Sequence, residues 1–393
     1  MKKNPSQRMQ GVQDAIMNVV GDWMKASPGT LSLGQGLAYY GPPQEVEVAL
    51  KAFFQDSTGH TYKPGHGIPD LLAAIRQKLA LENRLSLQEQ TVVVTAGSNM
   101  AFSHVIFAIT DPGDEVIILK PYYFNHEMAI TIAGAKPVCV DTDAHYVPIL
   151  SNIEAAITPQ TRAVVTISPN NPTGMVYPEA CLREINQLCR ERGLYHIHDE
   201  AYEHFVYEGA RVFSPGSIQD SQDYTISLYS LSKSYGFAGW RIGYMVIPQA
   251  LTVAVEKIQD TQLICPTVAA QYAAIGALKA GPQFVCAKRE QIETNRKIFL
   301  KTLNPLEEKG LRISPSQGAF YLFLALPTHL PALQICEELI RTYQVAVIPG
   351  ETFGVGEEGC YLRVAYGALS EEQAIEGSQR LLRGLEALVF SAS

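Results

Sequence analysis

Between residues 91 and 247 the sequence alternates short runs of β-branched residues with longer segments of helix-like composition. TVVVTAG precedes SNMAFSHVIFAIT, DEVIILK precedes EMAITIAGA, and further strand-like runs follow as TRAVVTIS, LYHIHD and DYTISLYS. Strands that alternate with helices form a mostly parallel sheet covered by helices on both faces. The pattern therefore predicts an α/β fold. It also directs attention to the carboxyl ends of the strands, where such sheets bind ligands.

The sequence pattern changes near residue 250. A long helix-like stretch leads to LRISPSQGAFYLFLAL, QVAVIPGETFG and GCYLRVAYG, which are short strand-like runs between helices. This order indicates a second, smaller α+β domain. In the chain of 393 residues we predict a large domain over residues 44–280 and a small domain made of residues 1–43 and 281–393.

Charge and composition narrow the class of protein. The formal net charge of −8 argues against a nucleic-acid or anionic-membrane surface. No run approaches the roughly 20 apolar residues that cross a bilayer, and the N-terminal Lys pair lacks the apolar core of a secretory signal. The seven cysteines show no metal-ligand spacing. We therefore expect reduced thiols, no bound metal and a soluble, cytoplasmic protein.

Polar residues gather at the ends of the strand-like runs. Gly97 and Ser98 follow TVVVTA and open a helix, whose backbone amides attract anions. Asp199 ends an apolar strand, where an unpaired carboxylate is costly to bury. Lys233 follows DYTISLYS among small hydroxyl residues. Taken singly, such residues also serve as helix caps, turns, salt bridges or solvated surface charges. The other strand-end candidates are Asn99, Asn171, Tyr202, Ser230, Ser232 and Arg241.

A phosphorylated pyridine aldehyde would use these groups together. Its phosphate fits the helix amides, the serine hydroxyls and the forked guanidinium of Arg241. Asp199 would hold the proton of the pyridinium nitrogen, and Asn171 could donate a hydrogen bond to the ring hydroxyl. Lys233 would form an imine with the aldehyde, since burial and cationic neighbours lower the pKa of its amine.

The same stretches resemble the class I/II, fold type I, pyridoxal-phosphate-dependent aminotransferases. SLSKSYGFAGWRIGY is similar to the lysine signature of that family, and NNPTG, HDEAY and LRVAYG match in the family's order. The resemblance covers nearly the whole chain. It implies a large domain with a mostly parallel central sheet, a smaller α+β domain, pyridoxal 5'-phosphate as cofactor, and a homodimer with shared active sites.

The resemblance also implies a role for each matching residue. Lys233 forms the internal aldimine and moves the substrate Cα proton, and Asp199 pairs with the pyridine nitrogen. Arg363 binds the substrate α-carboxylate with help from the Gly36 backbone. Tyr123 stacks on the cofactor ring, where relatives usually carry Trp or Phe. The ring 3-hydroxyl receives hydrogen bonds from Asn171 and Tyr202. The phosphate-site positions are Gly97, Ser98, Asn99, Ser230, Ser232 and Arg241, and Tyr62 from the neighbouring subunit.

The segment that follows GQG departs from the family pattern. Leu37-Ala38-Tyr39-Tyr40 lacks the proline that relatives usually have there. The family resemblance places this segment at the substrate pocket, so Tyr39 and Tyr40 together with Tyr123 indicate an apolar or aromatic subsite. We see no obvious second arginine for a distal carboxylate, although positions of the other subunit could supply one. We therefore predict a neutral or aromatic L-amino acid as donor and a 2-oxo acid as acceptor, used in a ping-pong reaction.

Other functions were weighed against this one. A carbon–sulfur lyase of the cysteine-conjugate type is the alternative on the same fold, because it begins with the same proton abstraction by Lys233. A cofactor-binding regulator would call for an appended DNA-binding module, for which the length and acidic balance leave no room. A nicotinamide enzyme is disfavoured because no Gly-x-Gly-x-x-Gly follows a strand.

Overall fold

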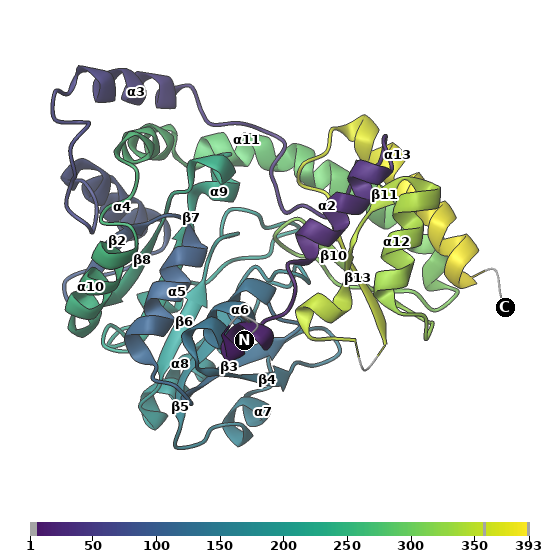
Figure 1. Ribbon diagram of the computed structural model, residues 1–393, viewed down its shortest axis with the longest axis horizontal. Helices are drawn as coiled ribbons and strands as arrows, with labels where there is room; N and C mark the ends of the chain where they lie inside the picture. Colours follow the sequence, from purple (N-terminus) through teal and green to yellow (C-terminus); the bar gives the residue numbers. More distant parts are fainter. Residues whose placement is uncertain (1–5, 357–358, 391–393) are drawn as a thin grey trace, which may run out of the picture.

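A seven-stranded sheet forms the centre of the computed structural model, which describes residues 6–356 and 359–390. Its strands lie in the order β2-β8-β7-β6-β5-β3-β4, and only β8 runs antiparallel to its neighbours (Figure 1). The predicted mostly parallel α/β sheet is confirmed. The strands are β2 (Gln90–Thr95), β3 (Glu115–Lys120), β4 (Lys136–Asp141), β5 (Thr161–Ile167), β6 (Tyr195–Asp199), β7 (Thr225–Ser230) and β8 (Gly243–Pro248).

Helices cover both faces of this sheet, which explains why its strands are continuous apolar runs. Ile118 and Val165 pack with α5 on one face, whereas their neighbours Ile117 and Val164 pack with α8 on the other. Consecutive side chains of a strand point to opposite faces, so each run must be apolar throughout. The covering helices are α5 (Ser98–Ile109), α6 (Phe124–Ala133), α10 (Thr252–Gln262), α7 (Leu150–Ala155) and α8 (Glu179–Arg192).

A second, antiparallel sheet lies beside the first, in the order β12-β13-β10-β9. Near the N-terminus, β1 pairs in parallel with β11, so the N-terminal segment joins the part of the molecule that contains the second sheet. The elements are β1 (Leu31–Ser32), β9 (Arg312–Ile313), β10 (Tyr321–Leu326), β11 (Val345–Ala346), β12 (Ile348–Pro349), β13 (Cys360–Ala365), α2 (Ile16–Ala26), α12 (Ala332–Tyr343) and α13 (Glu371–Leu385).

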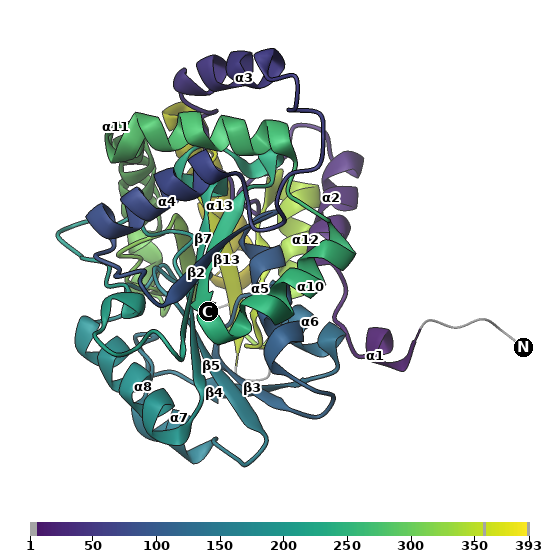
Figure 2. The ribbon, with the colours of Figure 1, turned by 90° about the vertical axis from the view of Figure 1, so that its left-hand side faces the viewer.

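The long helix α11 (Val268–Glu307) spans the two parts, and Figure 2 shows it running beneath α3 (Glu45–Gln55) and beside α4 (Pro69–Glu82). The helix is interrupted at Gly281, whose φ of 69° is left-handed, and Pro282 follows it. The predicted boundary between residues 280 and 281 falls at this kink. The division into domains stays a prediction, and residues 1–5, 357–358 and 391–393 of the predicted small domain lie outside the described residues.

Neither a membrane-spanning helix nor a cluster of metal-ligating side chains occurs in the described part of the chain. Within residues 6–356 and 359–390, no helix is both long and apolar enough to cross a bilayer. In the same residues, no three His, Cys, Asp or Glu side chains are grouped so as to hold a metal ion.

Candidate active site

A cavity of about 520 Å³ opens where the carboxyl ends of β5, β6 and β7 face the second sheet and the N-terminal segment. Parallel strands bring their ends to one edge, so residues far apart in sequence meet there. The predicted residues that line this cavity are Gly36, Ser98, Asn99, Tyr123, Asn171, Asp199, Tyr202, Ser230, Ser232, Lys233, Arg241 and Arg363.

Lys233 lies in the one-turn helix α9 (Leu231–Ser234), which follows β7 directly. The Ser230 hydroxyl accepts the Ser232 backbone N–H at 3.2 Å and starts this turn. On the other side, the Tyr40 hydroxyl lies 3.1 Å from the backbone oxygens of Lys233 and Ser234 and donates to them. The Lys233 Nζ donates to the Gly36 carbonyl at 2.5 Å. The backbone of the lysine is thus held from both sides while its amine faces the cavity.

The environment of Lys233 favours the neutral amine. Burial, followed by the positive charges of Arg363 and Arg241, lowers the pKa of Lys233 to about 8, and Asp199 opposes this shift. A neutral amine is the nucleophilic and basic form of lysine. At a given pH the amine is therefore available far more often than that of an exposed lysine.

Asp199 ends β6 and is 4% exposed. Its Oδ1 accepts the Ala201 backbone N–H at 2.9 Å, and its Oδ2 lies 3.2 Å from Nε2 of His126. His126 itself stacks on Phe102, with the ring centroids 3.9 Å apart. No lysine or arginine of the described chain forms a salt bridge with Asp199, so this buried carboxylate is available to a cationic ring nitrogen of a ligand.

An anion cradle, formed by Gly97, Ser98, Ser230, Ser232 and Arg241, lies at the start of α5. Gly97 has a φ of 86°, and a Cβ at this position would approach Arg241 Nη2 to 2.5 Å. Arg241 Nη1 is in turn 3.4 Å from the Ser232 hydroxyl. A helix N-terminus, hydroxyls and a guanidinium are the donors that a phosphate group requires. These residues fit the phosphate of the predicted cofactor.

Arg363 is 3% exposed and comes from β13 of the second sheet. Its Nη1 donates to Asn171 Oδ1 at 2.9 Å and its Nη2 to the Gly34 carbonyl at 2.6 Å. The Nε is buried without a hydrogen-bond partner, and no carboxylate of the described residues forms an ion pair with the guanidinium. An unpaired buried guanidinium beside a cavity fits the carboxylate of a small ligand.

Tyr123 stands at the start of α6, on the side of the cavity near Asn99. Its hydroxyl lies 3.4 Å from Asn99 Oδ1 and accepts a hydrogen bond of 2.7 Å from the Asn125 amide. Tyr202 approaches from the loop after β6, and its hydroxyl lies 2.5 Å from that of Tyr321. Both predicted aromatic residues therefore reach the cavity.

The structure does not bring Tyr39, Tyr62 or Gly97 into the cavity lining. Tyr39 is 38% exposed, and its ring packs edge-on against Tyr40 at 5.2 Å. Tyr62 is 78% exposed. Gly97 adjoins the site through Arg241, as described above. The substrate contact predicted for Tyr39 has no support within this chain, because the following residue, Tyr40, turns inward instead.

Several lining residues were not predicted. Tyr321 begins β10, and the strand pairing sets Phe323 opposite Arg363, which puts Tyr321 on the same face of the sheet two residues away. The alternation of side chains along GAFYLF could have indicated which residues share a face of the strand. Which face points to the cavity, however, depends on the partner strand, which the sequence does not identify. The unpredicted lining residues that surround the predicted ones are Ile16, Met17, Gln35, Phe124, Asn125, Met128 and Tyr321.

Known proteins are similar to this chain over a range that includes both sheets and most of the cavity residues. Residues 28–381 match the family model described as aminotransferase class I and II. The chain is 32% identical to the aromatic aminotransferase ISS1 of Arabidopsis thaliana over 98% of this chain and 97% of that protein. It is 35% identical to the aspartate/prephenate aminotransferase of Thermus thermophilus over 90% of this chain and 91% of that protein. The solved structure of the Thermus thermophilus aspartate aminotransferase with maleate superimposes with a TM-score of 0.89 at 31% identity, over 98% of this chain and all of that one.

Proposed function

The chain belongs to the class I and II aminotransferase family, and we propose that it moves the amino group of a neutral or aromatic L-amino acid to a 2-oxo acid. The enzyme is a pyridoxal-phosphate-dependent aminotransferase with the fold type I architecture. One of its relatives is named an aromatic aminotransferase and another an aspartate/prephenate aminotransferase. The choice between these donors must therefore rest on the cavity of this chain.

One observation carries the choice of donor. Lys233, Arg241 and Arg363 are the only cations among the described residues that line the cavity. Arg241 belongs to the anion cradle and Arg363 faces the carboxylate position, so the described residues of this chain offer no cation for a second carboxylate. The remaining wall is largely apolar, and it includes Ile16, Met17, Leu37, Phe124 and Met128. Such a wall favours an uncharged or aromatic side chain.

The residues present fit the cofactor. We assign its phosphate to the anion cradle, its pyridine nitrogen to Asp199, its ring hydroxyl to Asn171 and Tyr202, and its face to Tyr123. When bound, the cofactor supplies an aldehyde that reacts with amines and a ring that takes up the electron pair left at the substrate Cα.

The protein positions the substrate and moves its proton. Arg363, fixed by Asn171 and Gly34, holds the α-carboxylate, so that one bond of Cα is oriented. Lys233 Nζ then accepts the Cα proton, and it is suited to this because the lowered pKa of about 8 increases the fraction of neutral, basic amine. The Asp199 carboxyl group would accept a hydrogen bond from the protonated ring nitrogen of the cofactor and would thereby support electron withdrawal.

We also infer a homodimer with shared sites in the cytoplasm. Tyr62 and Phe54 are 78% and 72% exposed, so both aromatic side chains are accessible to a second subunit. In this arrangement Tyr62 of one chain serves the anion cradle of the other. All seven cysteines are unpaired, as a reducing compartment favours. The carbon–sulfur lyase alternative has no support from the family or from the named relatives.

A panel of amino donors tests this function. With an amino acid alone, we expect one equivalent of 2-oxo acid per bound cofactor, and continuous turnover only after a 2-oxo acid acceptor is added. We expect kcat/KM for leucine, methionine, phenylalanine or tyrosine to exceed that for aspartate and glutamate by at least tenfold. Faster turnover of aspartate would refute the proposed donor, and steady release of pyruvate and thiol from a cysteine conjugate without acceptor would refute the transferase reaction.

A further inference from the structure

We infer that Tyr321 is a positioning residue that donates its hydroxyl proton to Tyr202 and thereby strengthens Tyr202 as a donor toward the cofactor ring. The inference rests on the proposed function, in which Tyr202 hydrogen-bonds the ring hydroxyl. Tyr321 was not among the residues that the sequence pointed to. Tyr321 lines the cavity beside Tyr202 and is not among the groups assigned to the ring.

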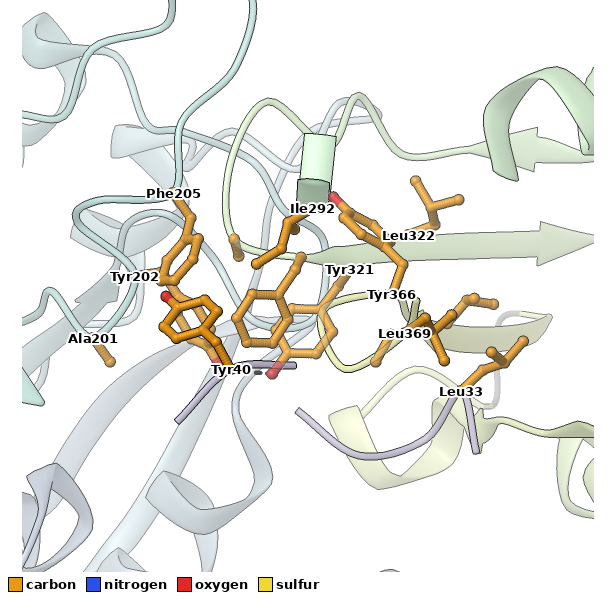
Figure 3. Packing of buried hydrophobic residues seen from close by; sticks show 14 of the residues in the cluster. Leu33, Tyr40, Ala201, Tyr202, Phe205, Ile292, Tyr321, Leu322, Tyr366 and Leu369 are labelled. Atoms are coloured by element: carbon orange, nitrogen blue, oxygen red, sulfur yellow. Dashed lines mark hydrogen bonds between the residues drawn. The ribbon is translucent and has the colours of Figure 1, made fainter. Parts of the chain in front are cut away.

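The two phenols come from different sheets and meet hydroxyl to hydroxyl. Tyr202 follows β6, whereas Tyr321 begins β10. Their oxygens are 2.5 Å apart, and the rings are nearly perpendicular with centroids 5.5 Å apart (Figure 3). Tyr321 is 1% exposed and Tyr202 5%, and both line the cavity. The contact is therefore buried at the wall of the site.

The Tyr321 side chain is held in place by two further contacts. The Arg363 guanidinium lies over its ring, 4.6 Å from the centroid. Its hydroxyl also lies against the backbone of Gly36, where any Cβ would collide with it. Gly36 is the residue whose carbonyl accepts the Lys233 amine. Tyr321 thus touches the carboxylate side, the lysine side and the ring-hydroxyl side of one cavity.

The count of protons sets the direction of the hydrogen bond. Burial raises the pKa of both Tyr202 and Tyr321, so both phenols stay protonated at neutral pH. Each has one proton, and neither forms another side-chain hydrogen bond within the described residues. If Tyr202 gives its proton to a ligand oxygen, the short contact can persist only with Tyr321 as the donor.

This direction has a measurable consequence. A phenol that accepts a hydrogen bond becomes a better donor itself, because hydrogen bonds in a chain polarise one another. Donation from Tyr321 therefore stabilises negative charge on the ring oxygen that Tyr202 contacts. Stabilising that negative charge lowers the pKa of the bound cofactor. The midpoint, which is the pH at which half of its visible absorption band has shifted, is therefore lower.

The experiment measures this midpoint by absorption in the cofactor-loaded protein. Tyr321→Phe keeps the ring under Arg363 and removes only the hydroxyl. We expect the midpoint to rise by roughly half a pH unit, since a polarised donor gains a modest fraction of one bond. We expect KM for the amino acid to change less than twofold. Tyr366→Phe is the matched control, because Tyr366 is equally buried, its hydroxyl lies 3.0 Å from the Ser316 hydroxyl, and it does not line the cavity.

A double-mutant cycle tests whether Tyr321 acts through Tyr202. In a Tyr202→Phe background, Tyr321→Phe should leave the midpoint unchanged. The inference is overturned if the shift is the same in both backgrounds, if Tyr321→Phe matches Tyr366→Phe, or if the midpoint does not move. Incorporation of 3-fluorotyrosine at position 321, which makes the phenol a stronger donor, should lower the midpoint, and a rise would overturn the inference without requiring a folded Phe variant.

The same spectra separate this inference from the proposed function. The proposed function predicts a visible absorption band that disappears in Lys233→Ala. If the wild-type protein shows no such band, the proposed function itself is overturned. A normal band whose midpoint ignores Tyr321 would overturn only the role of Tyr321.

Discussion

Replacing Arg363 by Gln tests how this chain recognises the α-carboxylate. The guanidinium gives one N–H to Asn171 and one to Gly34, and its Nε is free of protein partners. Three N–H groups therefore remain of the five that arginine carries, which is enough for a two-pronged contact with a carboxylate. Hydrogen bonds to charged groups contribute about 1.5–3 kcal/mol each. Loss of two should cost about 3–6 kcal/mol, or about 10²- to 10⁴-fold in kcat/KM.

The assay uses a ligand that carries only the carboxylate. The Kd of 3-phenylpropanoate, followed by the change in cofactor absorption, should rise by a similar factor in Arg363→Gln, together with the loss in kcat/KM. The control is Arg296→Gln, because Arg296 is also 3% exposed and also lies over a tyrosine ring, but it is paired with Glu208 outside the cavity. The reasoning is refuted if the Arg363 variant binds 3-phenylpropanoate within threefold of the wild type, or if both variants weaken binding equally.

Two more predictions concern Lys233 and Gly36. Because the pKa of Lys233 is lowered to about 8, the fraction of Lys233 in the neutral form increases as the pH rises through that value. The rate at which the apoprotein takes up the cofactor covalently should therefore increase with pH, with a midpoint near pH 8. Arg241→Gln should move this midpoint upward, since a positive neighbour is removed; stopped-flow absorption measures it, and a downward move would contradict the assigned cause. Gly36→Ala should reduce kcat/KM more than tenfold by pushing its Cβ into Tyr321, whereas Gly41→Ala, which has open space, should change it less than twofold. Equal kinetics for the two alanine variants would show that the collision is relieved at no cost.

The strand-end residues could be predicted because parallel strands bring their carboxyl ends to one edge. Asp199 and Lys233 follow neighbouring strands β6 and β7, so their proximity followed from the alternating pattern and needed no detailed packing. Gly97 and Arg241 lie at the ends that β2 and β8 share, where Thr95 is paired with Gly243. This part of the site is encoded locally, in the residues that end each strand.

The residues that were missed come from packing between distant segments. Tyr321 depends on the register of β10 against β13, and Ile16 and Met17 reach the cavity only because the N-terminal segment crosses its mouth. Tyr39 and Tyr40 are adjacent and identical in type, but the Tyr39 side chain is exposed and the Tyr40 side chain is buried. Tyr40 is buried because its hydroxyl reaches the backbone of Lys233, a contact across 193 positions that local pattern does not encode.

Three polar contacts cross the cavity, and together they explain why its parts act as one site. Arg363 of the second sheet donates to Asn171 in the loop after β5, the Tyr321 hydroxyl meets that of Tyr202, and the Lys233 amine donates to the Gly36 carbonyl. In each contact, one partner is assigned to the cofactor, and the other is Arg363 itself or a neighbour of Tyr321 or Arg363. A shift of the second sheet against the first would therefore alter carboxylate binding and donation to the ring together, and it would reach the amine through the contact of Tyr321 with Gly36. Because the contacts share Tyr321 and Gly36 as neighbours, substitutions there should be non-additive with Arg363→Gln, and additive effects would show that the three contacts work independently.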